Sequence, residues 1–121
     1  MSQQDDGLEH LLRVKSDDPL YLLLRDGKAR EFNDQHKRAR TADLTHCDFR
    51  HADLRGIEAE GIDFSHCYFR QADLRGVDFS NARLEGASIH AAKISGAYFP
   101  KELDPEEINL SLLHGTRMRY R

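Results

Sequence analysis

The sequence "CDFRHADLRG" at residues 47–56 is followed twenty residues later by "CYFRQADLRG" at residues 67–76, and eight of the ten letters agree. Internal repetition at a fixed interval is typical of repeat architectures. A shorter period lies inside the match, because the chain from Ala42 to Lys101 divides into twelve units of five residues. The first and third residues of each unit are apolar, and the other three are mostly polar or glycine.

The apolar residues are therefore spaced alternately by two and by three. A helix advances about 100° per residue, so this spacing forms no helical face. A spacing of two is typical of extended chain, in which residues i and i+2 point to the same side. The spacing of three puts two polar residues in succession, so the chain must turn there. Glycine, which tolerates corner conformations, ends five units: Gly56, Gly61, Gly76, Gly86 and Gly96.

Four such corners close a coil of twenty residues, and residues 42–101 then form three coils with a spacing of about 4.8 Å. The sequence thus predicts an all-β solenoid of very short strands. Residues twenty apart form four interior columns: Leu44, Phe64 and Leu84; Phe49, Phe69 and Ile89; Leu54, Leu74 and Ile94; Ala59, Phe79 and Phe99.

The units of residues 42–101, such as "ADLTH" and "ADLRG", resemble the pentapeptide-repeat family, whose units follow A(D/N)LXX. The resemblance covers about half of the chain. It implies a right-handed quadrilateral β-helix with the first and third residues inside, and the handedness comes from the resemblance alone. The unit "IEAEG" departs from the pattern, with Ala59 at the usually large central position. We expect Ile57 and Ile62 to fill the space.

The flanking sequences predict a short capping helix at each end. "SDDPLYLLLRDG" at residues 16–27 offers Asp17 or Asp18 as N-cap, Pro19 in the first turn and Gly27 after the last turn. "DPEEINLSLLHG" at residues 104–115 repeats this pattern. A stack of coils needs such covers because its open ends expose unpaired backbone.

Three regions follow from these signals. Residues 1–41 form an N-terminal segment with a capping helix, residues 42–101 the β-helix, and residues 102–121 a C-terminal capping helix and tail. Phe32 is a candidate plug for the first coil, while the state of the residues around it is left open. The sequence also leaves open whether residues 1–16 are ordered.

The C-terminal helix offers two apolar faces. Ile108 and Leu112 share one face, which can cover the last coil, while Leu110 and Leu113 lie on another. The second face is a candidate contact for a partner or a second copy of the chain, and simple capping is the alternative. Related pentapeptide-repeat proteins often dimerise end to end, so the resemblance implies a homodimer through the terminal helices.

A second candidate surface lies on the outer side of the coils. Its members are outward residues in neighbouring columns and at one corner: Arg50, Arg70, Tyr68, His90, His51 and Gln71. Two arginines and an exposed tyrosine are residue types that bind an anion or a protein partner. The alternative is an ordinary mixed surface. The neighbouring outer residues Asp53, Arg55, Asp73 and Arg75 are expected to neutralise one another.

No catalytic residue, metal site or cofactor is predicted. Cys47 and Cys67 stack inside the coils, where buried thiols act as apolar filler; a redox pair or half of a metal site is the alternative. His46 and His66 stack at an outer corner without an evident third metal ligand. No nucleophile or phosphate-loop motif occurs, and an interior filled by Phe and Leu leaves no substrate cavity.

Composition limits the partners and the location. The net charge is −3, and residues 42–101 carry nine acidic and seven basic residues, so nucleic acid is not an expected partner. No apolar run approaches the roughly 20 residues of a membrane span. The first residues lack a secretory pattern and there are two cysteines, which predicts a cytoplasmic protein.

We therefore expect a non-enzymatic scaffold that binds an unidentified protein partner. One alternative is a DNA-mimic modulator of DNA gyrase, as in the quinolone-protecting members of the family. It fits poorly because Lys93 follows Asp53 and Asp73 in their column, which interrupts the acidic run. The other alternative is an anion or nucleic-acid binder that uses Arg50 and Arg70, whose binding would depend strongly on salt.

Overall fold

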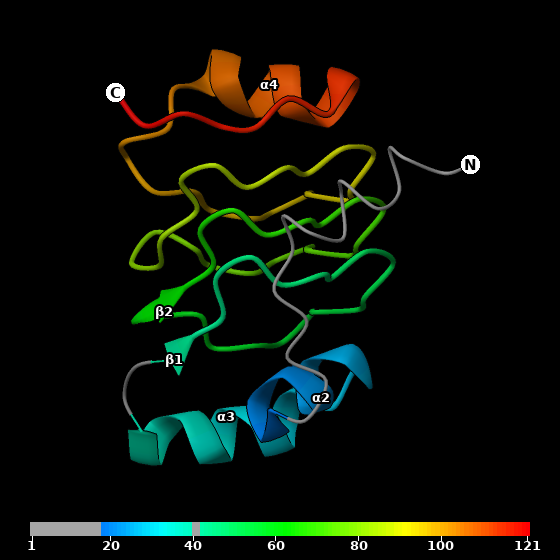
Figure 1. Cartoon of the computed structure of the whole chain (residues 1–121), viewed down its shortest axis with the longest axis vertical. Coiled ribbons are helices and arrows are strands. Elements are labelled where there is room, and N and C mark those ends of the chain that lie inside the picture. Colours follow the sequence, from blue (N-terminus) through cyan, green and yellow to red (C-terminus); the bar gives the residue numbers. More distant parts are fainter. Residues whose placement is uncertain (1–17, 40–41) are drawn as a thin grey trace, which may run out of the picture.

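Helices lie at both ends of the molecule, with the repeats between them. The structure is a computed structural model that describes residues 18–39 and 42–121. Helices α2 (Pro19–Arg25) and α3 (Ala29–Ala39) lie at one end, and α4 (Pro105–His114) lies at the other (Figure 1). No helix in these two ranges is long and apolar enough to cross a bilayer.

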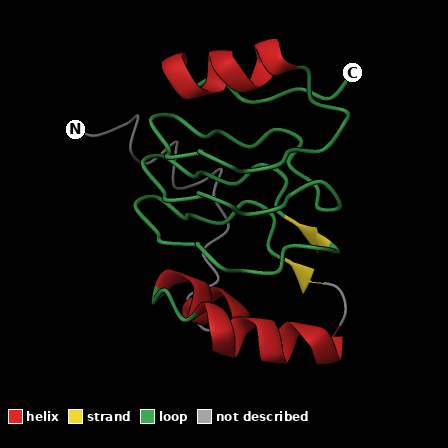
Figure 2. Cartoon of the chain, turned by 180° about the vertical axis from the view of Figure 1, so that it is seen from behind, coloured by secondary structure: helices red, strands yellow, loops and turns green. Residues whose placement is uncertain are grey.

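The repeats stack as three segments of twenty residues: the first segment (42–61), the second (62–81) and the third (82–101). Figure 2 shows them as loops, apart from strands β1 (Ala42–Asp43) and β2 (Ile62–Asp63), which pair in parallel. Isolated parallel bridges continue the same register: Asp48–Tyr68, Asp53–Asp73, Asp63–Arg83, Tyr68–Ser88, Asp73–Lys93 and Asp78–Tyr98. Pairing involves one or two residues at a time because a corner follows so soon. The predicted alignment of residues twenty apart is confirmed.

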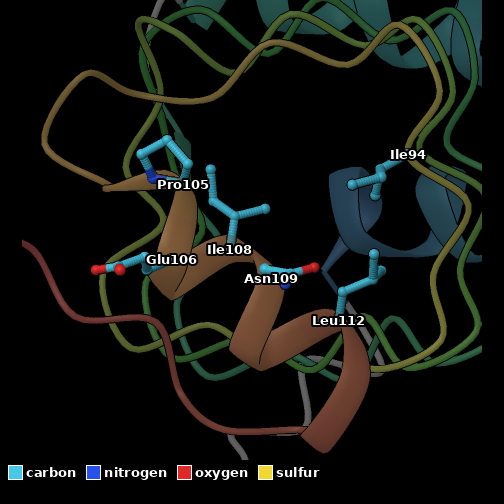
Figure 3. Close-up of a pocket in the computed structure, with 6 residues that line it drawn as sticks. All are labelled: Ile94, Pro105, Glu106, Ile108, Asn109 and Leu112. Atoms are coloured by element: carbon cyan, nitrogen blue, oxygen red, sulfur yellow. The ribbon is translucent and has the colours of Figure 1, made fainter.

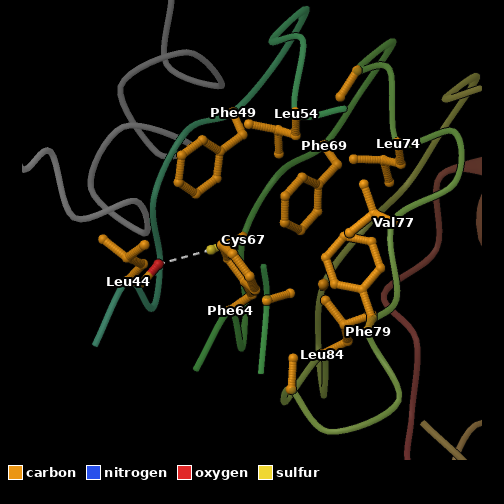
Figure 4. Close-up of a cluster of buried hydrophobic side chains, with 14 of the residues drawn as sticks. Leu44, Phe49, Leu54, Phe64, Cys67, Phe69, Leu74, Val77, Phe79 and Leu84 are labelled. Atoms are coloured by element: carbon orange, nitrogen blue, oxygen red, sulfur yellow. Dashed lines mark hydrogen bonds between the residues drawn. The ribbon is translucent and has the colours of Figure 1, made fainter. Parts of the chain in front are cut away.

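The third residues of the units form the core. Phe49, Phe64, Phe69 and Phe79 are fully buried (Figure 4). The rings of Phe49 and Phe69, twenty residues apart, stack with centroids 5.5 Å apart and planes 10° apart. Burial of each such side chain contributes about 1.5–3 kcal/mol. The predicted inward positions are therefore confirmed here.

The corners adopt left-handed backbone whether or not glycine occupies them. Gly56 has φ +86°, but His46, His66 and Gln71 at fifth positions also have φ between 58° and 63°. A non-glycine residue pays on the order of 1 kcal/mol or more for this conformation. The stacked segments impose the corner, so the glycines indicate only some of its positions.

The unit that departs from the repeat is accommodated by its neighbours. Ala59 is buried, and so are Ile57 and Ile62 on either side of it. The two larger side chains lie inside, as expected from the sequence. The small residue therefore does not interrupt the core.

The N-terminal end has the predicted helix signals. The N-cap of α2 is Asp18, whose side chain accepts hydrogen bonds from the backbone N–H groups of Leu20 (2.9 Å) and Tyr21 (3.4 Å). Gly27 follows with φ +72°. The next stretch, which the sequence left open, is helix α3, and its Phe32 is fully buried as a plug would be. The question of order in residues 1–16 lies outside the described residues.

The C-terminal end resembles the N-terminal end only in outline. Helix α4 follows Asp104 and ends at Gly115, which has φ +75°. The carboxylate of Asp104 makes no capping hydrogen bond and instead pairs with Arg121 at 3.0 Å. Leu110 and Leu113 are exposed by 43% and 59%. The predicted outer face of this helix is therefore exposed.

Candidate functional site

The predicted outer surface is less uniformly basic than its sequence indicates. Nε and Nη2 of Arg50 donate to the Asp48 carboxylate at 2.8 and 2.7 Å. Partial burial raises the pKa of Asp48, but the hydrogen bonds from Arg50 outweigh this effect and lower it overall. Arg70 is exposed and makes no ion pair with any described residue. The two arginines thus have different electrostatic surroundings.

The C-terminal residues cover the upper part of this surface. The guanidinium of Arg117 lies 5.3 Å from the centroid of the Tyr68 ring, a cation–π contact. His90 is half-buried and Gly115 packs closely against it. A Cβ atom added to Gly115 would lie 3.5 Å from the His90 side chain. Ser88, an outward position by sequence, is buried and its hydroxyl donates to the Gly115 carbonyl at 3.2 Å. His51, Arg70 and Gln71 remain exposed.

The charged side chains of Asp53, Arg55, Asp73 and Arg75 form a chain of ion pairs, here called the ladder. Arg55 pairs with Asp53 at 2.9 Å and with Asp73 at 3.3 Å, and Arg75 pairs with Asp73 at 2.7 Å. The hydrogen bond from Arg75 is the main reason that the pKa of Asp73 falls to about 2. Exposed pairs of this kind contribute about 0–1 kcal/mol each. The carboxylates are neutralised locally, as expected, so this surface is no continuous acidic column.

The two cysteines lie in the core. Both are buried thiols, and Sγ of Cys67 donates to the Leu44 carbonyl at 2.9 Å. Burial raises the pKa of Cys67 well above its ordinary value, which disfavours the reactive thiolate. His46 and His66 stack with ring centroids 4.7 Å apart. Residues 18–39 and 42–121 contain no group of three metal-ligating side chains.

The C-terminal tail, residues 116–121, packs along the third segment. The N–H of Met118 donates to the Ala87 carbonyl at 2.8 Å, and the N–H of Gly86 donates to the Met118 carbonyl at 2.6 Å. The hydroxyl of Tyr120 accepts from the N–H of Leu84 at 2.9 Å. Met118 is fully buried. This packing was not predicted from the sequence, although the alternation in "TRMRYR" is a signal for an extended segment.

Helix α4 leaves an apolar groove beside it, here called the end groove, with a volume of about 460 Å³. Its lining residues are Ile94, Pro105, Glu106, Ile108, Asn109 and Leu112 (Figure 3). Ile108 and Leu112 point toward Ile94 across this opening. The structure therefore divides the predicted end contact, because Ile108 and Leu112 line the groove while Leu110 and Leu113 are exposed elsewhere on α4.

Comparison with known families identifies the repeats. The model for pentapeptide repeats matches residues 38–58 and 62–99 with eight copies. The chain therefore belongs to the pentapeptide-repeat family. The gap in the match falls on residues 59–61, within the unit that has Ala59 at its centre. No curated protein and no solved structure matches the chain.

Proposed function

We propose that this chain is a non-enzymatic pentapeptide-repeat scaffold that binds another protein through its C-terminal end. The observation that carries the proposal is the surface of α4, which lines the open apolar end groove on one side and exposes Leu110 and Leu113 on another. Exposed leucines and an apolar groove on the same helix are typical of protein-binding surfaces. The proposed location is the cytoplasm, where the buried thiols stay reduced.

The architecture proposed with this function is a right-handed quadrilateral β-helix of three coils, with helices as caps. The twenty-residue register of the backbone bridges supports the coils. A contact between α3 and the first segment is evidence for the proposed N-terminal cap. Nδ2 of Asn33 donates a hydrogen bond to the Gly56 carbonyl at 2.9 Å. The domain limits in this proposal are residues 1–41, 42–101 and 102–121.

The filled interior supports a scaffold over an enzyme. The core is packed with aromatic and aliphatic side chains, and its two thiols are buried. The Asp48 partner of Arg50 weighs against a simple anion site, and the neutralised ladder weighs against DNA mimicry. Protein binding at the end is the function that remains best supported.

A second candidate is homodimerisation through the outer face of α4. The exposed fractions of Leu110 (43%) and Leu113 (59%) favour it, since two copies could bury these side chains against each other. Light scattering after size-exclusion chromatography tests this candidate. A mass of twice 13.9 kDa is expected for a dimer, and Leu110→Glu with Leu113→Glu should restore the monomer mass.

An affinity pull-down from native lysate tests the main proposal. The unmodified chain is compared with an end variant, Leu110→Glu with Asn109→Arg, and with a side variant, Arg70→Glu with Gln71→Glu. We expect the end variant to lose captured proteins that the side variant retains. Loss with the side variant alone would contradict the proposal and place the binding surface on the outer face.

A further inference from the structure

Several backbone N–H groups at the second positions of the units donate to the segment before, whereas many at third and fifth positions donate to the segment that follows. Each such donor in the second segment finds a carbonyl about twenty residues ahead. The distances are 2.8 Å for Leu74 to Lys93, 2.9 Å for Gly76 to Ser95 and 2.8 Å for Phe79 to Tyr98. The third segment has no fourth segment above it, so its own donors need other acceptors or water.

Residues 84–91 of the third segment, the covered edge, find these acceptors in the C-terminal residues. Their N–H donors and acceptors are Leu84 to the Tyr120 hydroxyl, Gly86 to the Met118 carbonyl, Ile89 to the Ser111 hydroxyl and Ala91 to the Leu112 carbonyl. These distances run from 2.6 to 3.0 Å. Helix α4 and the tail thus take the place of a further segment there.

The covered edge is followed by residues 92–99, here called the open edge. Neither helix α4 nor the tail pairs with the backbone of these residues. No described residue accepts a hydrogen bond from the N–H of Ile94, Gly96 or Phe99. No described residue donates to the carbonyls of Ala92 and Ala97, although the matching carbonyls one segment below are paired. The open edge therefore has both donors and acceptors available for an added strand.

The side chains at the open edge are also incompletely covered. Ile94 and Phe99 are half-buried, whereas Leu74 and Phe79 directly below them are fully buried. Ile94 lines the end groove, so the groove adjoins the open edge at this residue. An apolar side chain seated there would complete the core layer.

The tail indicates the chemistry of a strand that fits this end. It places the apolar side chains of Met118 and Tyr120 against the third segment, and the arginines between and after them pair with α4. Arg119 meets Glu107 at 2.9 Å, and Arg121 meets Asp104 at 3.0 Å. Glu106 lines the groove and makes no ion pair with a described residue. A basic side chain there would complement its charge.

We propose that the open edge and the end groove bind an extended segment of a partner protein in which apolar and basic residues alternate. Its backbone follows the corner at Gly96 and pairs with the N–H groups of Ile94 and Gly96 on one side and of Phe99 on the next. One apolar side chain enters the groove, and a basic side chain meets Glu106. This is strand addition, in which backbone pairing gives affinity and side-chain pockets give specificity. The inference rests on the proposed function, because it assumes that the C-terminal end binds a partner.

The test uses a phage-displayed library of random heptapeptides selected on the full chain, with an excess of the Asn109→Trp variant as competitor. Asn109 is an exposed residue of the groove, so the larger side chain obstructs the groove without removing core contacts. We expect enrichment of proline-free peptides in which apolar and basic residues alternate. Absence of such enrichment overturns the inference.

The enriched peptide is then added to the ¹⁵N-labelled chain. Amide exchange of Ile94, Gly96 and Phe99 should slow by about tenfold or more on saturation, because pairing protects the donors. Glu106→Lys should weaken binding by about threefold or more. Asp34→Lys, the same charge change on α3 at the opposite end, should leave binding unchanged. Protection elsewhere, or equal effects of the two variants, overturns the inference.

Three further outcomes bear on this inference or on the function on which it rests. If the chain is a dimer whose interface already protects the three amides without peptide, a second copy is the occupant and the inference is wrong. If the peptide fails while the end variant still loses proteins from lysate, the proposed function stands and strand addition is wrong. If the peptide binds while the end variant loses nothing, only the proposed function fails.

Discussion

The two ends of the repeat stack are finished in different ways. At the N-terminal end, α2 and α3 contribute the buried side chains of Tyr21, Leu24 and Phe32. At the C-terminal end, the only fully buried residue of α4 is Ser111, while Ile108 and Leu112 are half-buried against the core and Met118 of the tail is fully buried. The helices at the first end bury more apolar side chains than α4 does, and hydrogen bonds along one edge cover part of the second end.

Repeat N–H groups donate to the end residues more often at the C-terminal end than at the N-terminal end, where Glu58 to Asn33 is such a bond. At the N-terminal end, side chains donate to carbonyls of the first segment: the Tyr21 hydroxyl to Asp48 at 2.8 Å and Nη1 of Arg25 to Arg50 at 2.8 Å. At the C-terminal end, Ser111 and Tyr120 accept from the third segment. The difference shows that the C-terminal residues cover the third segment only along residues 84–91. The end groove lies beside this covered part, at Ile94.

The largest expected effect tests the plug at the N-terminal end. Phe32→Ala should lower the free energy of unfolding by about 3–5 kcal/mol, because a fully buried aromatic ring leaves a cavity. Ile108→Ala, at a half-buried position of α4, should cost less than half as much. Urea denaturation followed by circular dichroism measures both. Equal losses would remove the contrast between the two ends.

The next effect tests the tail. Met118→Ala should cost about 2–4 kcal/mol, since Met118 is fully buried against the third segment. It should also speed amide exchange at Gly86, whose N–H donates to the Met118 carbonyl. Thr116→Ala, at an exposed position of the tail, is the matched control and should change stability by less than about 0.5 kcal/mol. An unchanged exchange rate at Gly86 would show that the tail does not hold this edge.

A smaller effect tests the hydrogen bonds of α4. Ser111→Ala should cost about 1–3 kcal/mol, because it leaves the buried N–H of Ile89 without its acceptor. Ser95→Ala, at an exposed position of the same segment as Ile89, should be nearly neutral. Thermal unfolding compares the two variants with the unmodified chain. Equal melting temperatures for both would mean that the hydroxyl of Ser111 contributes nothing to this end.

The smallest effect concerns the surface ladder, which lies away from both ends. The pKa of Asp73 is lowered to about 2 from an ordinary value of 3.8, mainly by the hydrogen bond from Arg75. A lowered pKa means that the stabilisation is present above pH 4 and is lost as the pH falls toward about 2. Urea midpoints between pH 5 and pH 2 should therefore fall less steeply for Asp73→Asn. Parallel curves would contradict the assignment.

The sequence predicted the repeat region well because its signal is local and periodic. Alternate spacings of two and three place Phe49 and Phe69 inside, and the twenty-residue match places them in one column. The helix signals were also local: Asp18 and Gly27 mark the limits of α2. Helix α3 could not be predicted with the same certainty, since its few apolar residues, Ala29, Phe32 and Ala39, lie among charged and polar residues.

The candidate surfaces were predicted less completely. The outer columns were placed correctly, but Tyr68 and His90 are partly covered by residues 115–117, which no period connects to them. Ser88 was expected outside and is buried for the same reason. The alternation of the tail was visible in the sequence, but nothing in it indicated which edge the tail would join.

The sequence by itself determined which side chains face inward, how residues align between segments and where two of the helices begin and end. These properties depend on spacing over five and twenty residues and on capping groups next to each helix. Only the tertiary structure decided that Met118 pairs beside Gly86, that the third segment is covered along residues 84–91 and that a groove remains at Ile94. These contacts join the third segment to residues beyond the repeat, where the reach and direction of the chain, and not its period, determine what is covered.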